Sequence, residues 1–204
     1  MIERALLVLG VLALAFGSYN ALTFPAQIES YRIVFVHVPS AITSYLAFTV
    51  SFAYSILYLR SRDPTKDFFA SASAKAGLVL AVIAFITGAI WAKSTWGTYF
   101  TWYEIREVMV LLLIFVYAVY FSIRNIVESE REKFSALYLI IAYITVPFSY
   151  VAGFFSPLHP RPFEAEFSFE WRVNLLLMIS AFFAIYASYM LFRRKMVRTR
   201  NPQP

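Results

Sequence analysis

Six long apolar runs, separated by short polar or charged segments, are the feature that most constrains this chain. A helix that crosses the roughly 30 Å hydrocarbon core of a bilayer needs about 17 to 25 largely apolar residues. The chain has 204 residues, of which 60% are hydrophobic and 15% charged, so six such helices use nearly all of it. The sequence therefore predicts an all-α, polytopic membrane protein with one integral-membrane helical domain over residues 1–204.

The apolar runs set the expected transmembrane helices. They cover about residues 5–24, 36–59, 76–91, 107–123, 134–155 and 171–192. The first run is long and lacks a convincing Ala-x-Ala cleavage site, so we interpret it as a membrane span and not as a signal peptide. Pro39 is expected in the first turn of the second span, where its missing amide hydrogen is harmless. Pro147 is expected to bend the outer third of the fifth span.

The Lys and Arg residues divide unequally between the two sets of loops. Thirteen of the 18 belong to one set: twelve lie at the chain ends and in the turns near residues 60–66 and 124–133, and Lys75 follows the first of these turns. The other five are Arg32, Lys93, Arg106, Arg161 and Arg172. Since short cytoplasmic loops are enriched in Lys and Arg, both termini are expected in the cytoplasm. Loops 25–37, 91–107 and 153–171 are then expected on the extracytoplasmic side of the cell membrane.

The loop over residues 91–106 contains three of the four tryptophans. Its candidate binding residues are Trp91, Trp96, Gly97, Tyr99, Phe100, Trp102, Glu104 and Arg106. Tryptophan and tyrosine gather at membrane interfaces, so an ordinary aromatic belt is one interpretation of this loop. Several rings on one loop also predict a flat surface that suits a large, planar, apolar ligand.

The chain has two histidines, and the predicted topology places both at the outer membrane surface. A single interfacial histidine often only fills space at the level of the headgroups. Two imidazoles beside an aromatic surface suit the axial positions of a haem iron, so we predict His37 and His159 as axial ligands. The absence of cysteine excludes covalent attachment through a Cys-x-x-Cys-His sequence. The expected cofactor is therefore non-covalently bound haem b, and we expect its binding to be transient.

Two other kinds of metal site remain as alternatives. Zinc usually takes three or four ligands, and the glutamates near His159, which are Glu164, Glu166 and Glu170, could supply oxygens. The aromatic loop would then have no role. A quinol-type cytochrome b also uses axial histidines, but it carries them within the helix bundle, which fits two peripheral histidines less well.

Bound haem carries carboxylates, which require nearby cations. A guanidinium pairs with a carboxylate through two parallel hydrogen bonds, so Arg106 on the aromatic loop is the first candidate. Weaker candidates are Lys93, Arg32, Arg161 and Arg172. Each of these cations alone is also explained by a side chain that reaches from the end of a span into water.

Several functional classes are disfavoured by what the chain lacks. The spans contain almost no ionisable side chains, which argues against an ion-coupled pump. No phosphate-binding Gly-x-x-x-x-Gly-Lys sequence and no catalytic Ser-His-Asp or His-Glu-x-x-His arrangement is visible, so the chain is not expected to be an enzyme. The basic residues lie beside apolar runs, which indicates membrane topology and no nucleic-acid partner.

Three pieces of the sequence resemble CcmC-type haem-handling proteins of cytochrome c maturation, a group with a tryptophan-rich outer loop. The pieces are residues 31–41, the tryptophan-containing residues 91–102, and Leu158-His159 after Val146-Pro147. The resemblance implies that both histidines bind haem iron and that the aromatic loop supports the haem. It also implies haem transfer to a membrane-anchored haem chaperone, with help from an ABC-type transporter.

The chain departs from the family pattern within the aromatic loop. The family usually has Trp-x-Trp-Asp where this chain has residues 99–104. Allowing one inserted residue aligns Glu104 with the usual Asp and Arg106 with the usual Arg. A cytochrome b-like redox subunit and a cofactor-free permease or assembly subunit remain the alternative functions.

Overall fold

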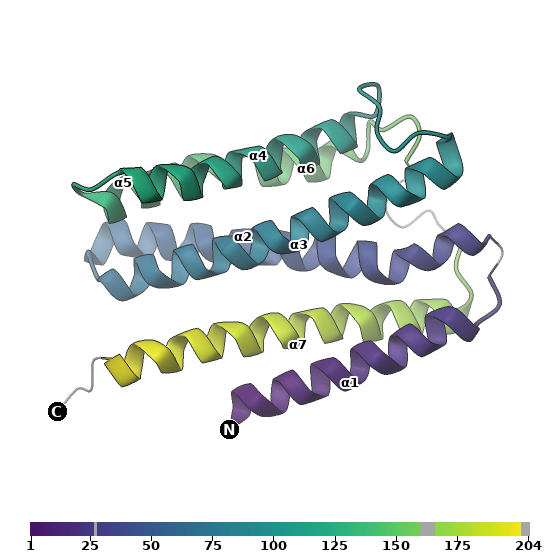
Figure 1. The fold of residues 1–204 in the computed structure, drawn as a ribbon, viewed down its shortest axis with the longest axis horizontal. Helices are drawn as coiled ribbons and strands as arrows, with labels where there is room; N and C mark the ends of the chain where they lie inside the picture. Colours follow the sequence, from purple (N-terminus) through teal and green to yellow (C-terminus); the bar gives the residue numbers. More distant parts are fainter. Residues whose placement is uncertain (27, 160–165, 201–204) are drawn as a thin grey trace.

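The computed structural model describes residues 1–26, 28–159 and 166–200, apart from the side chains of residues 198 and 200, and these residues form a helical bundle (Figure 1). The elements are α1 (Ile2–Thr23), a short 3-10 helix η1 (Glu29–Ile33), α2 (Val34–Ser61), α3 (Pro64–Trp96), α4 (Ile105–Ile126), α5 (Arg131–Ala142), α6 (Thr145–Ala152) and α7 (Phe169–Arg200). Six helical segments are long and apolar enough to cross a membrane, with α5 and α6 together forming one of them. The described residues contain no strand, and the predicted all-α fold with six spans is confirmed.

The helices form three layers, with α2 and α3 in the middle (Figure 1). On one side, α4 packs with α5 and α6, and the core here centres on Phe48, Tyr117 and Leu139. On the other side α1 packs against α7, and a second core joins Phe35 to Trp171. The middle pair is therefore covered on both faces by other helices.

Helix α3 begins earlier than the sequence predicts. The third span was expected to begin at about Ala76 or somewhat earlier, and the helix starts at Pro64. The Asp63 side chain accepts a hydrogen bond from the Thr65 amide at 2.8 Å, and proline suits a first helical position because its missing amide hydrogen is not needed there. The charged turn between α2 and α3 is correspondingly short.

The same helix also ends later than predicted. Gly97 has a φ of +80°, a left-handed conformation that favours glycine and ends helices. Its amide donates to the Lys93 carbonyl oxygen at 3.2 Å. Trp91 and Trp96 therefore lie on the last turns of α3 and not on a loop. Residues 76–92 carry no charge and span about 26 Å of helix, so these indoles lie at one end of the apolar stretch.

The two prolines behave differently. Because α2 already begins at Val34, Pro39 lies in its second turn, so the prediction of a first-turn position is wrong. Pro147 cannot donate to the Tyr143 carbonyl, and the expected interruption of the fifth span occurs at Tyr143 and Ile144, nearer its middle than predicted. The Val146 amide bonds the Tyr143 oxygen instead, at 3.0 Å.

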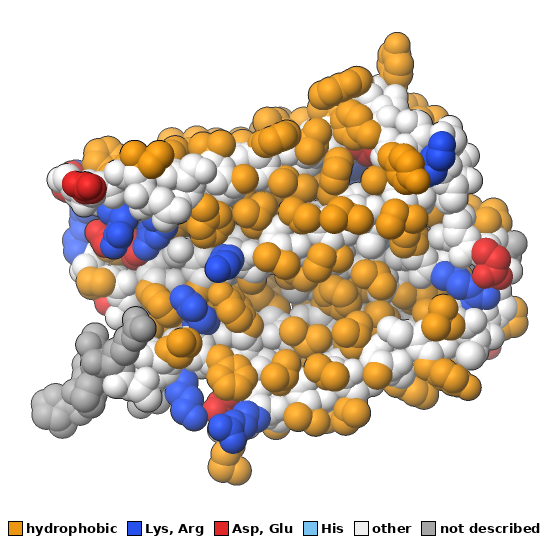
Figure 2. Space-filling model, in the orientation of Figure 1, with side chains coloured by type: hydrophobic (Ala, Val, Ile, Leu, Met, Phe, Trp, Pro, Cys, Tyr) orange, Lys and Arg blue, Asp and Glu red, His pale blue; other side chains and the backbone are white. Residues whose placement is uncertain are grey.

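The basic side chains are concentrated at one end of the bundle. In Figure 2 Lys and Arg gather toward the end of the bundle where α7 finishes in Figure 1, while hydrophobic side chains cover the middle. Six crossings, an even number, would leave the start of α1 and the end of α7 on the same side of a membrane. That this side is cytoplasmic stays a prediction from the charge distribution.

Candidate functional site

A pocket lies among α2, α3 and α4, at the end of the bundle opposite the basic cluster. It is partly open, and its unfilled space is about 640 Å³ when the part open to its surroundings is counted. Its ionisable lining residues are His37, Arg106, Glu107 and His159. The rest of the lining is largely apolar and includes the two indoles at the end of α3.

His37 is held by the main chain of α3. Its Nδ1 lies 2.9 Å from the Ala84 carbonyl oxygen and 3.3 Å from the Thr87 hydroxyl oxygen. A carbonyl oxygen only accepts, so Nδ1 carries the hydrogen and the lone pair remains on Nε2. A Cβ at Gly88 would lie 3.0 Å from His37 Cε1, so the glycine makes room for the imidazole.

His159 reaches the same pocket from the segment after α6. The centroids of the two imidazole rings lie 6.2 Å apart, and the Trp91 ring lies 5.7 Å from His159. Two imidazoles that bind one metal ion from opposite sides have centroids about 6 Å apart, because each nitrogen lies about 2 Å from the metal. The spacing of the histidines therefore suits a single iron with two axial ligands.

Glu104 organises the segment that carries His159. Its carboxylate is fully buried and accepts hydrogen bonds from the Ser156 hydroxyl and from the Leu158 amide, the latter at 3.1 Å. The Ser156 oxygen in turn accepts from the His159 amide at 3.0 Å. Glu104 does not line the pocket; it joins the start of α4 to the histidine segment.

Arg106 contacts His159 directly. Its Nη1 lies 3.2 Å from His159 Nδ1, and since a guanidinium has only donors, the imidazole nitrogen accepts. A Cβ at Gly153 would lie 3.0 Å from the same Nη1. Gly153 therefore leaves space for the guanidinium beside the second histidine.

The aromatic residues do not form one flat surface, so that part of the prediction is wrong. Trp91 and Trp96 line the pocket with centroids 5.3 Å apart, but their planes meet at 78°, edge to face. Trp102 is 75% exposed and Tyr99 is 59% exposed, outside the pocket. Phe100 packs on Trp102 with centroids 5.0 Å apart, and Gly97 serves to end α3.

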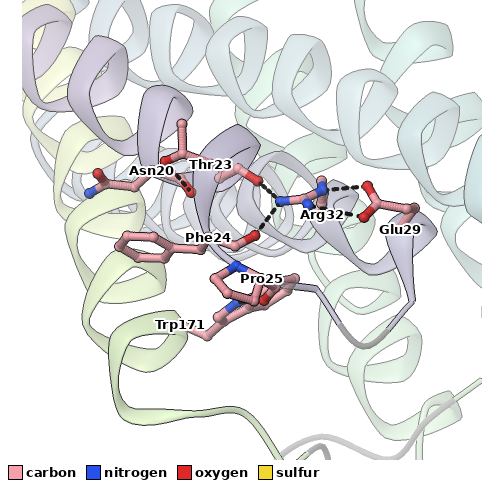
Figure 3. Close-up of polar contacts among 8 residues, drawn as sticks. Asn20, Thr23, Phe24, Pro25, Glu29, Arg32 and Trp171 are labelled. Atoms are coloured by element: carbon pink, nitrogen blue, oxygen red, sulfur yellow. Dashed lines mark hydrogen bonds and ion pairs between the residues drawn. The ribbon is translucent and has the colours of Figure 1, made fainter.

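Arg32, one of the weaker candidate cations, instead stabilises the fold (Figure 3). Its Nη1 donates to the carbonyl oxygens of Ala21 and Phe24 at 2.5 and 2.8 Å, and it pairs with Glu29 at 2.7 Å. The Trp171 indole nitrogen donates to the Pro25 oxygen at 3.0 Å beside this cluster. These contacts fix the entry into α2, which carries His37.

Two of the remaining candidate cations also have protein partners. Lys93 donates to the Gly97 carbonyl oxygen and Arg172 to the Phe167 carbonyl oxygen, both at 2.8 Å. Arg161 lies outside the described residues. Among the described residues, Arg106 is the arginine that lines the pocket.

Sequence reasoning missed several other residues that shape the pocket. On α2, Ala41, Ser44 and Tyr45 follow His37 at intervals of four, seven and eight residues, which places them on one helix face. On α3, the small residues Ala81, Ala84 and Gly88 repeat at intervals of three or four. This helical spacing was a usable signal, whereas the contact of Glu104 with Ser156 had no local signal.

The donor set fits haem better than a bare metal ion. The described residues contain no group of three or more His, Asp or Glu side chains able to hold a metal ion. Glu164, which the zinc alternative would use, lies outside the described residues. Haem iron requires only axial ligands from the protein, and the paired imidazoles in a largely apolar pocket meet that requirement.

Comparison with known proteins identifies the family. A protein of Marchantia polymorpha described as a putative cytochrome c biosynthesis ccmC-like mitochondrial protein is 30% identical over 168 residues, covering 80% of this chain and 68% of the relative. Heme exporter protein C of Bradyrhizobium diazoefficiens is 27% identical over 203 residues, covering 93% and 77%. The family described as Heme exporter protein C matches residues 1–203. Because this match spans nearly the whole chain, the protein belongs to the Heme exporter protein C family.

Proposed function

We propose that the protein binds haem b non-covalently between His37 and His159 and presents it to a membrane-anchored haem chaperone for c-type cytochrome biogenesis. The observation that carries this proposal is the pair of imidazoles, 6.2 Å apart beside Trp91 in a largely apolar pocket. Membership of the family supports the broader role in haem handling. The family is one of transport and assembly subunits, and no enzymatic step is assigned.

The pocket residues have separate tasks in this proposal. His37 and His159 donate lone pairs to iron, while Trp91 and Trp96 offer ring surface to the macrocycle. Arg106 provides a cation for a haem carboxylate. The ring of Trp102, at the exposed tip of the α3–α4 loop, is available to an approaching partner.

Transfer requires that one imidazole leaves the iron. A partner can shift that equilibrium only if it interacts differently with the two states of the site. A chaperone that supplies its own ligand meets this condition, and an ABC-type transporter could supply energy from outside this chain. We place the pocket on the extracytoplasmic side because the opposite end carries most of the Lys and Arg residues.

Absorption spectra of the haem-supplemented protein test the ligand assignment. We expect a low-spin spectrum for the parent and loss of the six-coordinate form in both His37→Ala and His159→Ala. Unchanged low-spin spectra in both variants would refute the assignment. Rapid haem reduction by a quinol analogue would instead favour a redox subunit, and a colourless protein that copurifies with partners would favour a cofactor-free subunit.

A further inference from the structure

The two histidines present different nitrogen atoms to their protein partners. His37 donates through Nδ1 to a carbonyl oxygen, 2.9 Å away on Ala84, so its Nε2 lone pair is available for iron. His159 accepts through Nδ1 from Arg106, 3.2 Å away. A neutral imidazole that accepts at Nδ1 carries its hydrogen on Nε2. In this state neither nitrogen of His159 has a lone pair for a metal.

We propose that Arg106 acts as a latch on His159: its hydrogen bond to Nδ1 and iron ligation by the same imidazole exclude each other. His37 therefore binds iron first, and His159 binds only after Arg106 has moved away. The inference rests on the proposed function, because it concerns the order in which the two ligands bind haem. Arg106 is in this respect a positioning residue, acting on iron through His159.

The change from the bond with Arg106 to the bond with iron involves no oxidation or reduction of His159. The hydrogen bond between Arg106 and Nδ1 breaks, the proton on Nε2 of His159 leaves, and a proton is taken up at Nδ1. The imidazole stays neutral and offers its Nε2 lone pair. Ligand release runs through the same changes in reverse, so the return of Arg106 to Nδ1 favours the empty site.

Arg106 contacts a glycine with its side chain and Glu104 with its amide. The guanidinium lies beside Gly153, where the glycine lacks a side chain that would fix it. The helix start that carries Arg106 is joined to the His159 segment through Glu104, whose carboxylate bonds the Arg106 amide at 3.3 Å. The main chain can therefore remain in place while the side chain exchanges partners.

The first test examines the empty protein. With ¹⁵N-labelled histidine in lipid nanodiscs, two imidazoles give two sets of nitrogen signals, assigned by His37→Ala. We expect the proton on Nδ1 in His37 and on Nε2 in His159. Arg106→Leu should shift the His159 signals, while Arg106→Lys, which keeps the charge and a donor, should shift them less. A proton on Nδ1 of His159, or signals insensitive to Arg106→Leu, would overturn the latch.

The second test separates the latch from carboxylate binding by using haem dimethyl ester, which has no free carboxylates. We expect Arg106→Leu to bind the ester about tenfold more tightly than the parent, because a hydrogen bond from a charged donor no longer competes with iron. The same substitution in a His159→Ala background should have no such effect. Equal or weaker ester binding by Arg106→Leu would refute the latch.

The outcomes distinguish the latch from the proposed function. If no variant binds haem or its ester, the proposed function fails, while the nitrogen signals still report the contact between Arg106 and His159. If haem binds normally but Arg106→Leu changes neither readout, only the latch fails. Thermal unfolding of Arg106→Leu and Arg106→Lys checks that both variants are folded.

Discussion

His37 and His159 face the same pocket, but the protein holds them in different ways. His37 lies within the 28-residue helix α2, and its ring is bonded to the main chain of α3. His159 lies on the segment after α6, and its position depends on two side chains, those of Glu104 and Arg106. A side chain on a packed helix loses little further freedom when it binds a ligand, whereas a loop segment has more freedom to lose. His37 is part of the helical scaffold, whereas His159 is held by contacts with side chains of other segments.

The largest expected effect compares removal of each histidine. We expect His37→Ala to weaken haem binding at least about tenfold more than His159→Ala does. The His37→Ala variant retains only His159, which must first be released from Arg106 and ordered before it binds iron. Haem titration of both variants in nanodiscs measures the two dissociation constants. Equal losses, or a larger loss for His159→Ala, would show that the two ligands are equivalent and that the comparison is wrong.

Two glycine substitutions probe the two sides of the pocket separately. In Gly88→Ala the new Cβ would lie 3.0 Å from Cε1 of His37, so we expect about tenfold weaker haem binding, typical of overpacking. In Gly153→Ala the nearest atom is the flexible end of Arg106, also at 3.0 Å, and the effect should be smaller. Haem titration gives both effects, and unchanged circular dichroism confirms intact helices. A larger effect of Gly153→Ala would mean that the His159 side of the pocket, and not the His37 side, is the more rigid one.

Glu104 tests whether the His159 segment depends on one carboxylate. Glu104→Ala leaves the Leu158 amide and the Ser156 hydroxyl without their acceptor, which should cost about 1–3 kcal/mol. We expect faster hydrogen exchange at the Leu158 amide and weaker ligation by His159, with no change in the nitrogen signals of His37. Glu104→Gln keeps one carbonyl oxygen and should be intermediate. Slow exchange in Glu104→Ala would mean that other contacts hold the segment.

The smallest effect is expected at the far end of the bundle. The Thr65 amide donates to Asp63 and holds the pKa of this carboxyl below its usual value of 3.8. A lowered pKa in the folded state stabilises the protein at pH values above the usual pKa. This stabilisation disappears as the pH falls through the lowered pKa. We expect Asp63→Ala to cost about 1 kcal/mol at neutral pH, with the unfolding temperatures of parent and variant converging in acid. Haem affinity should not change; if it does, the two ends are coupled.

The membrane spans could be predicted because each depends only on a continuous apolar run. The ends of α3 were misjudged although local signals existed, since Asp63 and Pro64 mark its start and Gly97 marks its end. The predicted histidines do share one pocket, because the topology places both helix ends at the same side. Whether they bind haem iron stays a prediction.

Other parts of the site had no counterpart in the sequence pattern. The carboxylate of Glu104 meets the Leu158 amide 54 positions away, and Arg106 meets His159 across 53. Such contacts depend on how the loops fold over the bundle, which neither hydropathy nor spacing encodes. For the same reason the sequence suggested Arg32 as a candidate cation for haem. In the structure, Arg32 instead donates a hydrogen bond to a carbonyl oxygen at the end of α1.

The two indoles that line the pocket, Trp91 and Trp96, share helix α3 with Gly88, so their angular positions around the helix relative to Gly88 are fixed. One residue added between Gly88 and Trp91 would rotate the indole by about 100° and move it 1.5 Å along the axis. The same addition after Gly97 would only lengthen an exposed connection. The alignment predicted from the sequence puts one inserted residue before Glu104, in the stretch where an insertion leaves the indoles of α3 in place.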